Sequence, residues 1–208
     1  MTFPPYAILS HTWTNGAEVT YDELVTGARK DKASYAKIRF CGERAAHDGL
    51  QYFWVDTCCI DKSSSAELTE ALNCMFRWYQ SSAKCYVYLS DVSSSRLPSE
   101  DAFLGSRWFI RGWTLQELIA PEVVEFYTAD DVLLGDKLSL EGIINKASGS
   151  LLFGVRGASY SLSVFSLKRS HFGLRLDEER HHNAKTSKQH ETRLSKPSTC
   201  QRHVGPRG

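Results

Sequence analysis

The sequence predicts an α/β domain with a mostly parallel central sheet. Short runs rich in β-branched and aromatic residues, at 6–13, 51–60 and 84–92, show almost no alternation of apolar and polar side chains. Such runs are typical of strands that helices cover on both faces. The segments between these runs have the apolar spacing of amphipathic helices. Strands that alternate with helices favour a parallel sheet between two helical layers.

The first part of the chain predicts one strand followed by two helices or by one bent helix. Residues 6–13 form the strand, and Asn15-Gly16 marks a turn. A helix is expected from Thr20, because Thr20 and Glu23 have the spacing of a capping box. Residues 30–34 interrupt the helical pattern, which gives two helices or one bent helix, and the helical region is expected to end near residues 47–49.

The middle of the chain predicts a second strand and a long helix. Residues 51–60 are expected to be extended, which would place Cys58 and Cys59 on opposite faces of the strand. A loop follows and ends at Ser64, which has capping-box spacing to Glu67. The helix over residues 66–80 sets its apolar side chains at core spacing.

The last predicted elements surround a segment dense in aromatic and charged residues. A third strand over 84–92 leads through a Ser/Pro-rich linker into residues 106–121, SRWFIRGWTLQELIAP, which are expected to form a helix ended by proline. A fourth strand over 122–127 and a helix over 138–147 complete the domain, with loops predicted at 130–131 and 135–136.

Composition and charge indicate one domain followed by a basic tail. The chain has 208 residues and a formal net charge of +1, so the total charge does not favour nucleic acid or an anionic membrane as a partner. Residues 1–165 hold 15 Lys+Arg against 20 Asp+Glu, a balance of −5, whereas residues 166–208 hold 10 against 4, a balance of +6. We therefore expect a domain over 1–165 and a disordered tail over 166–208.

The sequence predicts a cytoplasmic protein. The first residues lack the basic and apolar regions of a signal peptide, and no apolar run approaches the roughly 20 residues that cross a bilayer. The six cysteines show no CxxC spacing, so a zinc ribbon is not expected and no metal site is predicted. We expect these cysteines to be small buried thiols in a reducing compartment.

Polar residues gather where the predicted strands end. In parallel sheets, ligands bind beyond the carboxyl ends of the strands. The side chains at these ends are Ser10, His11, Thr12, Trp13, Asp56, Thr57, Asp61, Ser90 and Asp91. Chemistry is therefore expected at this edge of the sheet.

Four separated blocks of the chain resemble the fungal heterokaryon incompatibility (HET) domain. They read YAILSHTW, YFWVDTCCIDKSSSAELTEALNCMFRWY, CYVYLSDV and SRWFIRGWTLQELIAPEVVEFY, in order, over roughly residues 6–149. The resemblance implies a role in fungal non-self recognition, in which HET domains trigger programmed cell death. Family members continue beyond an RGAS-like block into a helical stretch. Here Arg156-Gly-Ala-Ser159 is present without a recognisable continuation, so the domain is expected to be incomplete at its C-terminal end.

HET domains are also considered distant relatives of Toll/interleukin-1 receptor (TIR) domains, which implies a flavodoxin-like three-layer fold. Several TIR domains cleave NAD, with a catalytic glutamate in a W-x-x-x-E-L pattern. Trp113 to Leu118 has that pattern, so the resemblance implies Glu117 as the catalytic carboxylate. Trp113 and Trp13 would stack on a ring of NAD, with His11, Asp56 and Arg111 as further contacts. No cofactor is required, since NAD would be the substrate.

Each of these residues also has a purely structural interpretation. Thr114 and Glu117 have capping-box spacing, so the glutamate would then only satisfy an N–H at a helix start. Asp56 and Asp61 would only bond loop N–H groups. Arg107 and Arg111, four residues apart, would either clamp phosphates or, structurally, lie on a solvated helix face or pair with Glu122 and Glu125. A nucleophile–base pair of Cys58 with His11 is a further, disfavoured alternative, because Cys58 lies in an apolar run.

Two functions from different classes therefore remain open. In the first, the domain is an enzyme that hydrolyses NAD. In the second, it is an interaction module without chemistry of its own, which signals death by oligomeric assembly. The expected partners are a second copy, other HET or receptor proteins, and an NAD-like nucleotide. Neither nucleic acid nor a membrane span is expected.

Overall fold

The computed structural model describes residues 4–94, 100–147 and 200–201. The chain divides into two compact units, one of residues 1–155 with 197–208 and one of residues 156–196, and every described residue belongs to the first. The predicted domain end at residue 165, the RGAS block and the predicted tail lie outside the described residues, apart from 200–201.

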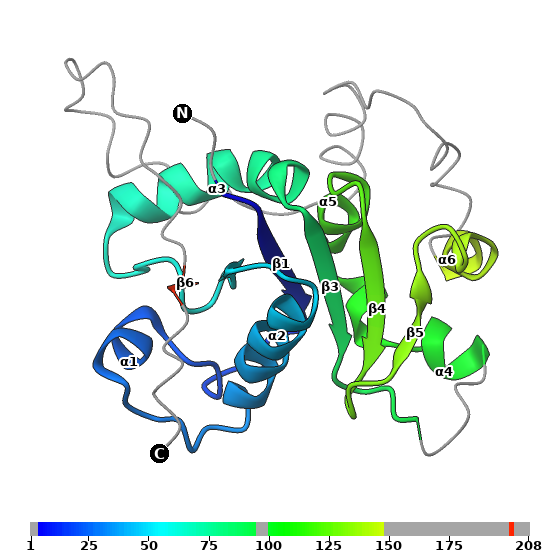
Figure 1. Cartoon of the computed structure of the whole chain (residues 1–208), viewed down its shortest axis with the longest axis horizontal. Helices are drawn as coiled ribbons and strands as arrows, with labels where there is room; N and C mark the ends of the chain where they lie inside the picture. Colours follow the sequence, from blue (N-terminus) through cyan, green and yellow to red (C-terminus); the bar gives the residue numbers. More distant parts are fainter. Residues whose placement is uncertain (1–3, 95–99, 148–199, 202–208) are drawn as a thin grey trace, which may run out of the picture. The chain divides into compact units, whose positions relative to one another are not determined.

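A central sheet organises the first unit (Figure 1). Its strands lie in the order β5-β4-β3-β1-β2-β6. Their bounds are Tyr6–His11 for β1, Tyr52–Trp54 for β2, Lys84–Leu89 for β3, Val124–Thr128 for β4, Leu133–Asp136 for β5 and Cys200–Gln201 for β6. Strands β2, β1, β3 and β4 pair in parallel, whereas β5 and β6 pair antiparallel to their neighbours. The prediction of an α/β domain with a mostly parallel sheet is confirmed.

Helices cover both faces of this sheet. Their bounds are Tyr21–Thr26 for α1, Tyr35–His47 for α2, Ser65–Ser81 for α3, Glu100–Leu104 for α4, Arg107–Ile110 for the 3-10 helix η1, Thr114–Ile119 for α5 and Glu141–Ala147 for α6. On one face Phe40 of α2 packs against the rings of Tyr86 and Tyr127, at centroid distances of 6.4 and 5.1 Å. On the other face Trp54 packs against Trp78 of α3 at 5.2 Å. The core lies in these two aromatic layers.

Several local predictions are confirmed. The capping box of α1 is complete, since Thr20 accepts from the Glu23 backbone and the Glu23 carboxylate accepts from Thr20 N at 3.0 Å. Residues 30–34 interrupt the helical region as predicted, and of the two alternatives the structure has two helices, α1 and α2. Ser64 caps α3 by accepting from Glu67 N. The prediction of buried free thiols is confirmed for Cys41, Cys58 and Cys85. It is wrong for Cys59, which is disulfide-bonded, and Cys74 is a free thiol that is only partly buried.

The predicted strand over 51–60 is wrong beyond Trp54. The carbonyl oxygen of Val55 accepts from Cys58 N at 3.3 Å and from Cys59 N at 2.9 Å, which closes a turn. Both cysteines are therefore buried in a turn rather than on opposite faces of a strand. A continuous apolar run indicates that both sides of the chain are buried. A buried turn has the same composition as a buried strand, so the run does not distinguish the two.

The single helix predicted over 106–121 is also wrong. The segment forms η1 and α5, and Arg111 between them has the extended conformation φ −80°, ψ 139°. Asp91 anchors the first piece, because its carboxylate accepts from Ser106 Oγ and from Arg107 N, both at 2.8 Å. Arg107 and Arg111 therefore do not share a helix face. Strand β5 was not predicted either, because Gly135-Asp136 is a loop signal in the sequence, whereas Gly135, with φ +151°, lies within the strand.

Candidate functional site

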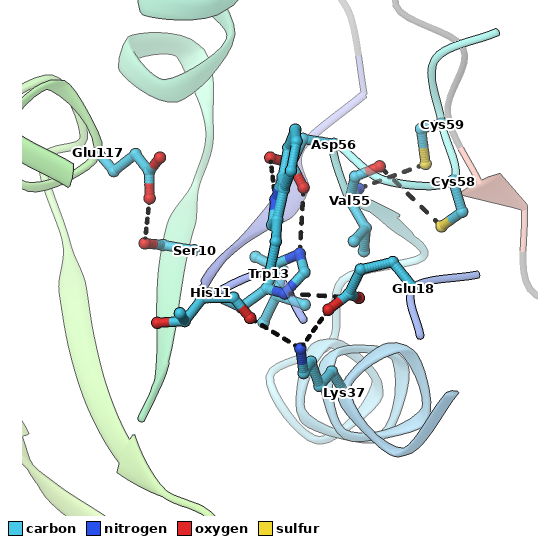
Figure 2. A network of polar contacts seen from close by, with 12 residues as sticks. Ser10, His11, Trp13, Glu18, Lys37, Val55, Asp56, Cys58, Cys59 and Glu117 are labelled. Atoms are coloured by element: carbon cyan, nitrogen blue, oxygen red, sulfur yellow. Dashed lines mark hydrogen bonds and ion pairs between the residues drawn. The ribbon is translucent and has the colours of Figure 1, made fainter. Parts of the chain in front are cut away.

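Two polar clusters meet at the carboxyl end of β1 (Figure 2). Successive residues of a strand point to opposite faces, so Ser10 and His11 face opposite sides of the sheet. Ser10 points toward α5 and contacts Glu117. His11 points toward the segment after β2 and contacts Asp56. Both side chains are buried. Because Ser10 and His11 are consecutive in the sequence, the two clusters lie on either side of the same strand end.

Glu117 is a buried carboxyl at the centre of the first cluster. It is 2% exposed, and its Oε2 accepts from Ser10 Oγ at 2.5 Å. The Ser10 oxygen in turn accepts from Trp108 Nε1 at 2.7 Å. Burial raises the pKa of Glu117 from 4.5 to about 7, against the opposing effects of the Arg111 charge and the Ser10 hydrogen bond. A carboxyl with this pKa can exchange a proton near neutral pH, which general acid–base chemistry requires.

The capping-box interpretation of Glu117 is wrong. Trp113 is the N-cap of α5 and makes no side-chain cap hydrogen bond. Thr114 Oγ1 donates instead to the carbonyl oxygen of Arg111 at 2.7 Å. The Glu117 side chain therefore points away from the helix start and into the first cluster.

The second cluster holds Asp56 between two side chains from β1 and the loop that follows it. Asp56 Oδ1 lies 3.1 Å from His11 Nε2, and Asp56 Oδ2 accepts from Trp13 Nε1 at 3.0 Å. Burial opposes ionisation of Asp56, but the hydrogen bond and charge of His11, with the charges of Lys62 and Arg111, hold its pKa below the usual value. Asp56 is therefore an anion at neutral pH.

A buried ion pair supports the second cluster from α2. Lys37 Nζ donates to Glu18 Oε1 at 2.6 Å and to the carbonyl oxygen of Thr12 at 2.8 Å. Glu18 Oε2 also lies 4.0 Å from His11 Nδ1. Lys37 is 6% exposed, so its cation is almost fully removed from water. These contacts fix the end of β1 against α2.

Arg111 connects the two clusters. Its guanidinium donates to the carbonyl oxygen of His11 and lies 5.8 Å from the ring centroid of Trp13. Its charge also lowers the pKa values of both Glu117 and Asp56. Lys62 Nζ lies over the same Trp13 ring at 4.0 Å. The half-exposed Trp13 ring thus contacts two cations at this edge of the sheet.

The structure brings together five of the six predicted site residues: Glu117, Arg111, His11, Asp56 and Trp13. Trp113 lies apart, because it is 42% exposed at the start of α5 while Glu117 is buried one turn further on. Asp61 serves its own turn, accepting from Ser63 N at 2.9 Å. Burial, with the nearby charge of Asp56, raises the pKa of Cys58 to about 12, so this thiol is not the nucleophile of a pair with His11.

Sequence reasoning missed the residues that support the two clusters. Trp108, Glu18, Lys37 and Lys62 were not predicted as site residues. Their sequence positions carry no motif, because each reaches the site through a contact with a residue distant along the chain. The alternation of side chains along a strand predicts that Ser10 and His11 face opposite sides of the sheet. It does not predict which residues they contact.

The described residues contain further features with a bearing on binding. One surface hollow of about 220 Å³ is lined by Phe40, Glu43, Arg44, His47 and Asp131, and another of about 280 Å³ by Glu100, Phe103, Leu134, Leu140 and Ile143. Neither hollow is lined by Glu117.

Within the part of the chain that the structure describes, no group of His, Cys, Asp and Glu is arranged to hold a metal ion. No helix there is both long and apolar enough to cross a membrane.

Comparisons with known proteins identify the relationship of this chain. The chain is 52% identical over 171 residues to the vegetative incompatibility protein HET-E-1 of Podospora anserina, an alignment that covers 79% of this chain and 12% of that protein. The chain therefore spans only a small part of the length of this relative. No solved structure matches it. Residues 6–104, which carry β1 to α4 and the second cluster but neither Arg111 nor Glu117, match the heterokaryon incompatibility protein (HET) family.

Proposed function

We propose that this chain acts in fungal heterokaryon incompatibility as a domain that triggers cell death. The match of residues 6–104 to the HET family and the identity to an incompatibility protein support this role. The aligned part is 12% of that relative, so the proposal concerns the matched domain and not the activity of the whole relative. The proposed partners are other incompatibility proteins, and the proposed location is the cytoplasm.

The fold proposal is a TIR-like variant of the flavodoxin-like sheet. In the flavodoxin-like order the parallel strands run 2-1-3-4-5. The order β2-β1-β3-β4 agrees with this over four parallel strands. The antiparallel β5 departs from it. Ligands of such sheets bind beyond the carboxyl end of the first strand, where Ser10 and His11 lie.

The chemistry that we propose is hydrolysis of NAD at the bond between nicotinamide and ribose. The observation that carries the proposal is the buried Glu117 with a pKa of about 7, at the carboxyl end of β1 and next to Arg111. As the bond to nicotinamide breaks, positive charge develops on the ribose, and an adjacent carboxylate stabilises it. Water then adds to the ribose carbon and releases a proton. Arg111 and Lys62 supply positive charge for the phosphates.

Access to Glu117 requires a local movement. The carboxyl is 2% exposed, so a nucleotide reaches it only after a neighbouring segment is displaced. The connection between η1 and α5 is the segment that carries Arg111, whose guanidinium bonds to His11 O. A closed site of this kind fits a death-triggering enzyme, because it stays inactive until a partner opens it.

Glu117→Gln is expected to abolish NAD loss and cell death together. Glutamine keeps the shape and can still accept from Ser10, but it has no charge to stabilise the ribose cation. The measurement is NAD concentration over time, beside viability, in cells expressing the full chain or the variant. The matched control is Glu122→Gln, the same change at an exposed position. NAD loss that persists in Glu117→Gln would rule out this enzyme.

The second candidate is a non-enzymatic module that signals by assembly. The observation that favours it is the exposure of apolar side chains on both sides of Arg111. Ile110 is 81% exposed and Trp113 is 42% exposed. Exposed apolar residues that neighbour one another are typical of protein–protein contacts.

Ile110→Asp separates the two candidates. If the domain acts by assembly, the buried charge at the contact is expected to abolish oligomers and cell death while the NAD concentration stays constant in all strains. Oligomers are measured by light scattering of the purified full chain. Val25→Asp is the control, because Val25 is 67% exposed on α1, an element separate from this surface. Cell death by Ile110→Asp at the level of the unmodified chain would contradict the module.

A further inference from the structure

A donor chain of three buried residues ends on Glu117. Trp108 Nε1 donates to Ser10 Oγ at 2.7 Å, and Ser10 Oγ donates to Glu117 Oε2 at 2.5 Å. The three residues come from η1, β1 and α5, and each is at most 2% exposed. Water therefore does not compete for these hydrogen bonds in the described conformation.

The chemistry of these groups gives the chain one direction. An indole N–H can only donate, so one lone pair of the Ser10 oxygen is occupied by Trp108. The Ser10 hydroxyl hydrogen is then directed to Glu117 Oε2. Because Oε2 accepts this hydrogen, the proton of the neutral carboxylic acid belongs on Oε1. The two oxygens of Glu117 thereby acquire different roles.

We propose that Ser10 and Trp108 are positioning residues that fix Glu117 Oε2 as an acceptor, so that Oε1 carries the proton in the neutral acid and is the oxygen left for a substrate in the ionised form. The part of this inference that concerns a substrate rests on the proposed function. The part that concerns the two oxygens does not. Neither residue touches the reacting atoms, so both act through Glu117.

Pairing and packing hold Ser10 and Trp108 in place. Ser10 lies in β1 and is paired with Val87 of β3, whereas the pairing of β1 with β2 ends at Ile8. The Trp108 ring packs edge-on against Phe109 and Phe126, at centroid distances of 5.0 and 5.6 Å. Supporting groups that are locked by packing in this way keep a reactive side chain in one geometry. The contact of Ser106 with Asp91 anchors the start of η1.

Other titratable and charged groups also face Glu117. They are Arg111 before α5, Asp56 after β2, Tyr79 on α3 and Cys85 on β3. Arg111 favours the ionised carboxylate and Asp56 disfavours it, whereas burial keeps Tyr79 and Cys85 neutral. Of these groups and the donor chain, only Ser10 makes a hydrogen bond to the carboxyl oxygens among the described contacts. Loss of the Ser10 hydrogen bond is therefore expected to shift the pKa of Glu117 more than loss of the hydroxyl of a buried serine that does not bond to Glu117.

The test is the pH midpoint of the Glu117 side-chain carbon, followed by NMR in the full chain with ¹³C-labelled glutamate carboxyls. Glu117→Gln identifies the signal by its disappearance. Ser10→Ala is expected to raise the midpoint by about one pH unit, because the carboxylate loses its donor. Ser10→Thr keeps the hydroxyl and is expected to restore the midpoint. Ser82→Ala is the control, because Ser82 is buried and its hydroxyl donates to Tyr79 O at 2.7 Å, away from Glu117.

A second variant keeps the proposal open to contradiction if Ser10→Ala does not fold. Trp108→Phe removes the N–H and keeps an aromatic ring, so the Ser10 hydroxyl is free to rotate. We expect a smaller rise of the midpoint, about half that of Ser10→Ala. An unchanged midpoint in both Ser10→Ala and Trp108→Phe overturns the inference. If only Trp108→Phe folds, its unchanged midpoint overturns the inference by itself.

A separate measurement tests the proposed enzyme activity. The pH profile of NAD loss is measured for the same variants, and Ser10→Ala is expected to shift it in the direction of the NMR midpoint. A shifted midpoint without any NAD hydrolysis by the unmodified chain supports the role of Ser10 and Trp108 and refutes the enzyme. NAD hydrolysis that depends on Glu117, with an unchanged midpoint, supports the enzyme and refutes the positioning role.

Discussion

Glu117→Gln is expected to stabilise the folded chain by about 3 kcal/mol at about pH 8. The folded pKa of Glu117 is raised from 4.5 to about 7, so the folded state holds a proton that the unfolded chain has lost between these values. The contribution of Glu117 is therefore fully favourable below about pH 4.5 and is lost as the pH rises through about 7. Glutamine does not ionise, so the variant avoids the cost of burying a charge.

The measurement is the free energy of unfolding by urea at about pH 5 and about pH 8. We expect the stability gain of Glu117→Gln at the higher pH to exceed its gain at the lower pH by roughly 2 kcal/mol or more. Glu122→Gln is the matched control and is expected to change the free energy of unfolding by less than about 0.5 kcal/mol, since Glu122 is exposed. An equal effect of Glu117→Gln at both pH values would show that the carboxyl is not titrating near neutrality.

This stability effect bears on function. Above neutral pH the buried carboxyl is less favourable to the fold than an uncharged glutamine of the same shape. A stabilising change that also removes activity is typical of a residue with a functional role. The two results expected for Glu117→Gln, greater stability and loss of NAD hydrolysis, therefore support each other when they occur in one variant.

The sequence predicts the framework of this fold because its strands and long helices carry periodic signals. The apolar runs of β1 and β3 and the capping boxes near Thr20 and Ser64 depend on residues close together in the chain. The predictions are wrong where contacts between residues distant in the sequence determine the local structure. The segment of η1 and α5 is broken because Asp91 holds Ser106 and Arg107, and no local pattern records that contact.

The candidate site shows the same division. Strand-end polarity predicts Ser10, His11 and Asp56, and the resemblance to TIR domains adds Glu117. Neither predicts that Glu117 bonds to Ser10, 107 residues away in the sequence, or that Trp108 completes the chain of donors. Neither signal predicts that Glu117 is buried rather than open to a ligand. The partners and the burial of a polar residue are set by tertiary packing, and one sequence does not contain them in readable form.

Glu18→Ala is expected to destabilise the folded chain by about 3 kcal/mol or more, because it leaves the buried Lys37 cation without its counter-charge. Lys37 is 6% exposed and lies 2.6 Å from Glu18 Oε1. The variant also removes the acceptor of Thr14 N, which donates to Glu18 Oε1 at 2.7 Å. The measurement is urea unfolding of the full chain. Glu43→Ala is the control, because its pair with Arg39 is exposed at 3.9 Å and is expected to matter by less than about 0.5 kcal/mol.

A double variant tests whether charge burial is the cause. Lys37→Met replaces the cation by an apolar side chain of similar length, so Glu18→Ala in that background no longer exposes an unpaired buried charge. We expect the cost of Glu18→Ala to fall by about 2 kcal/mol when Met occupies position 37. The free energies of unfolding of the four chains form a closed cycle that isolates this coupling. Additive effects of the two changes would mean that Glu18 stabilises the fold through Thr14 and His11, and that Lys37 is held by Thr12 alone.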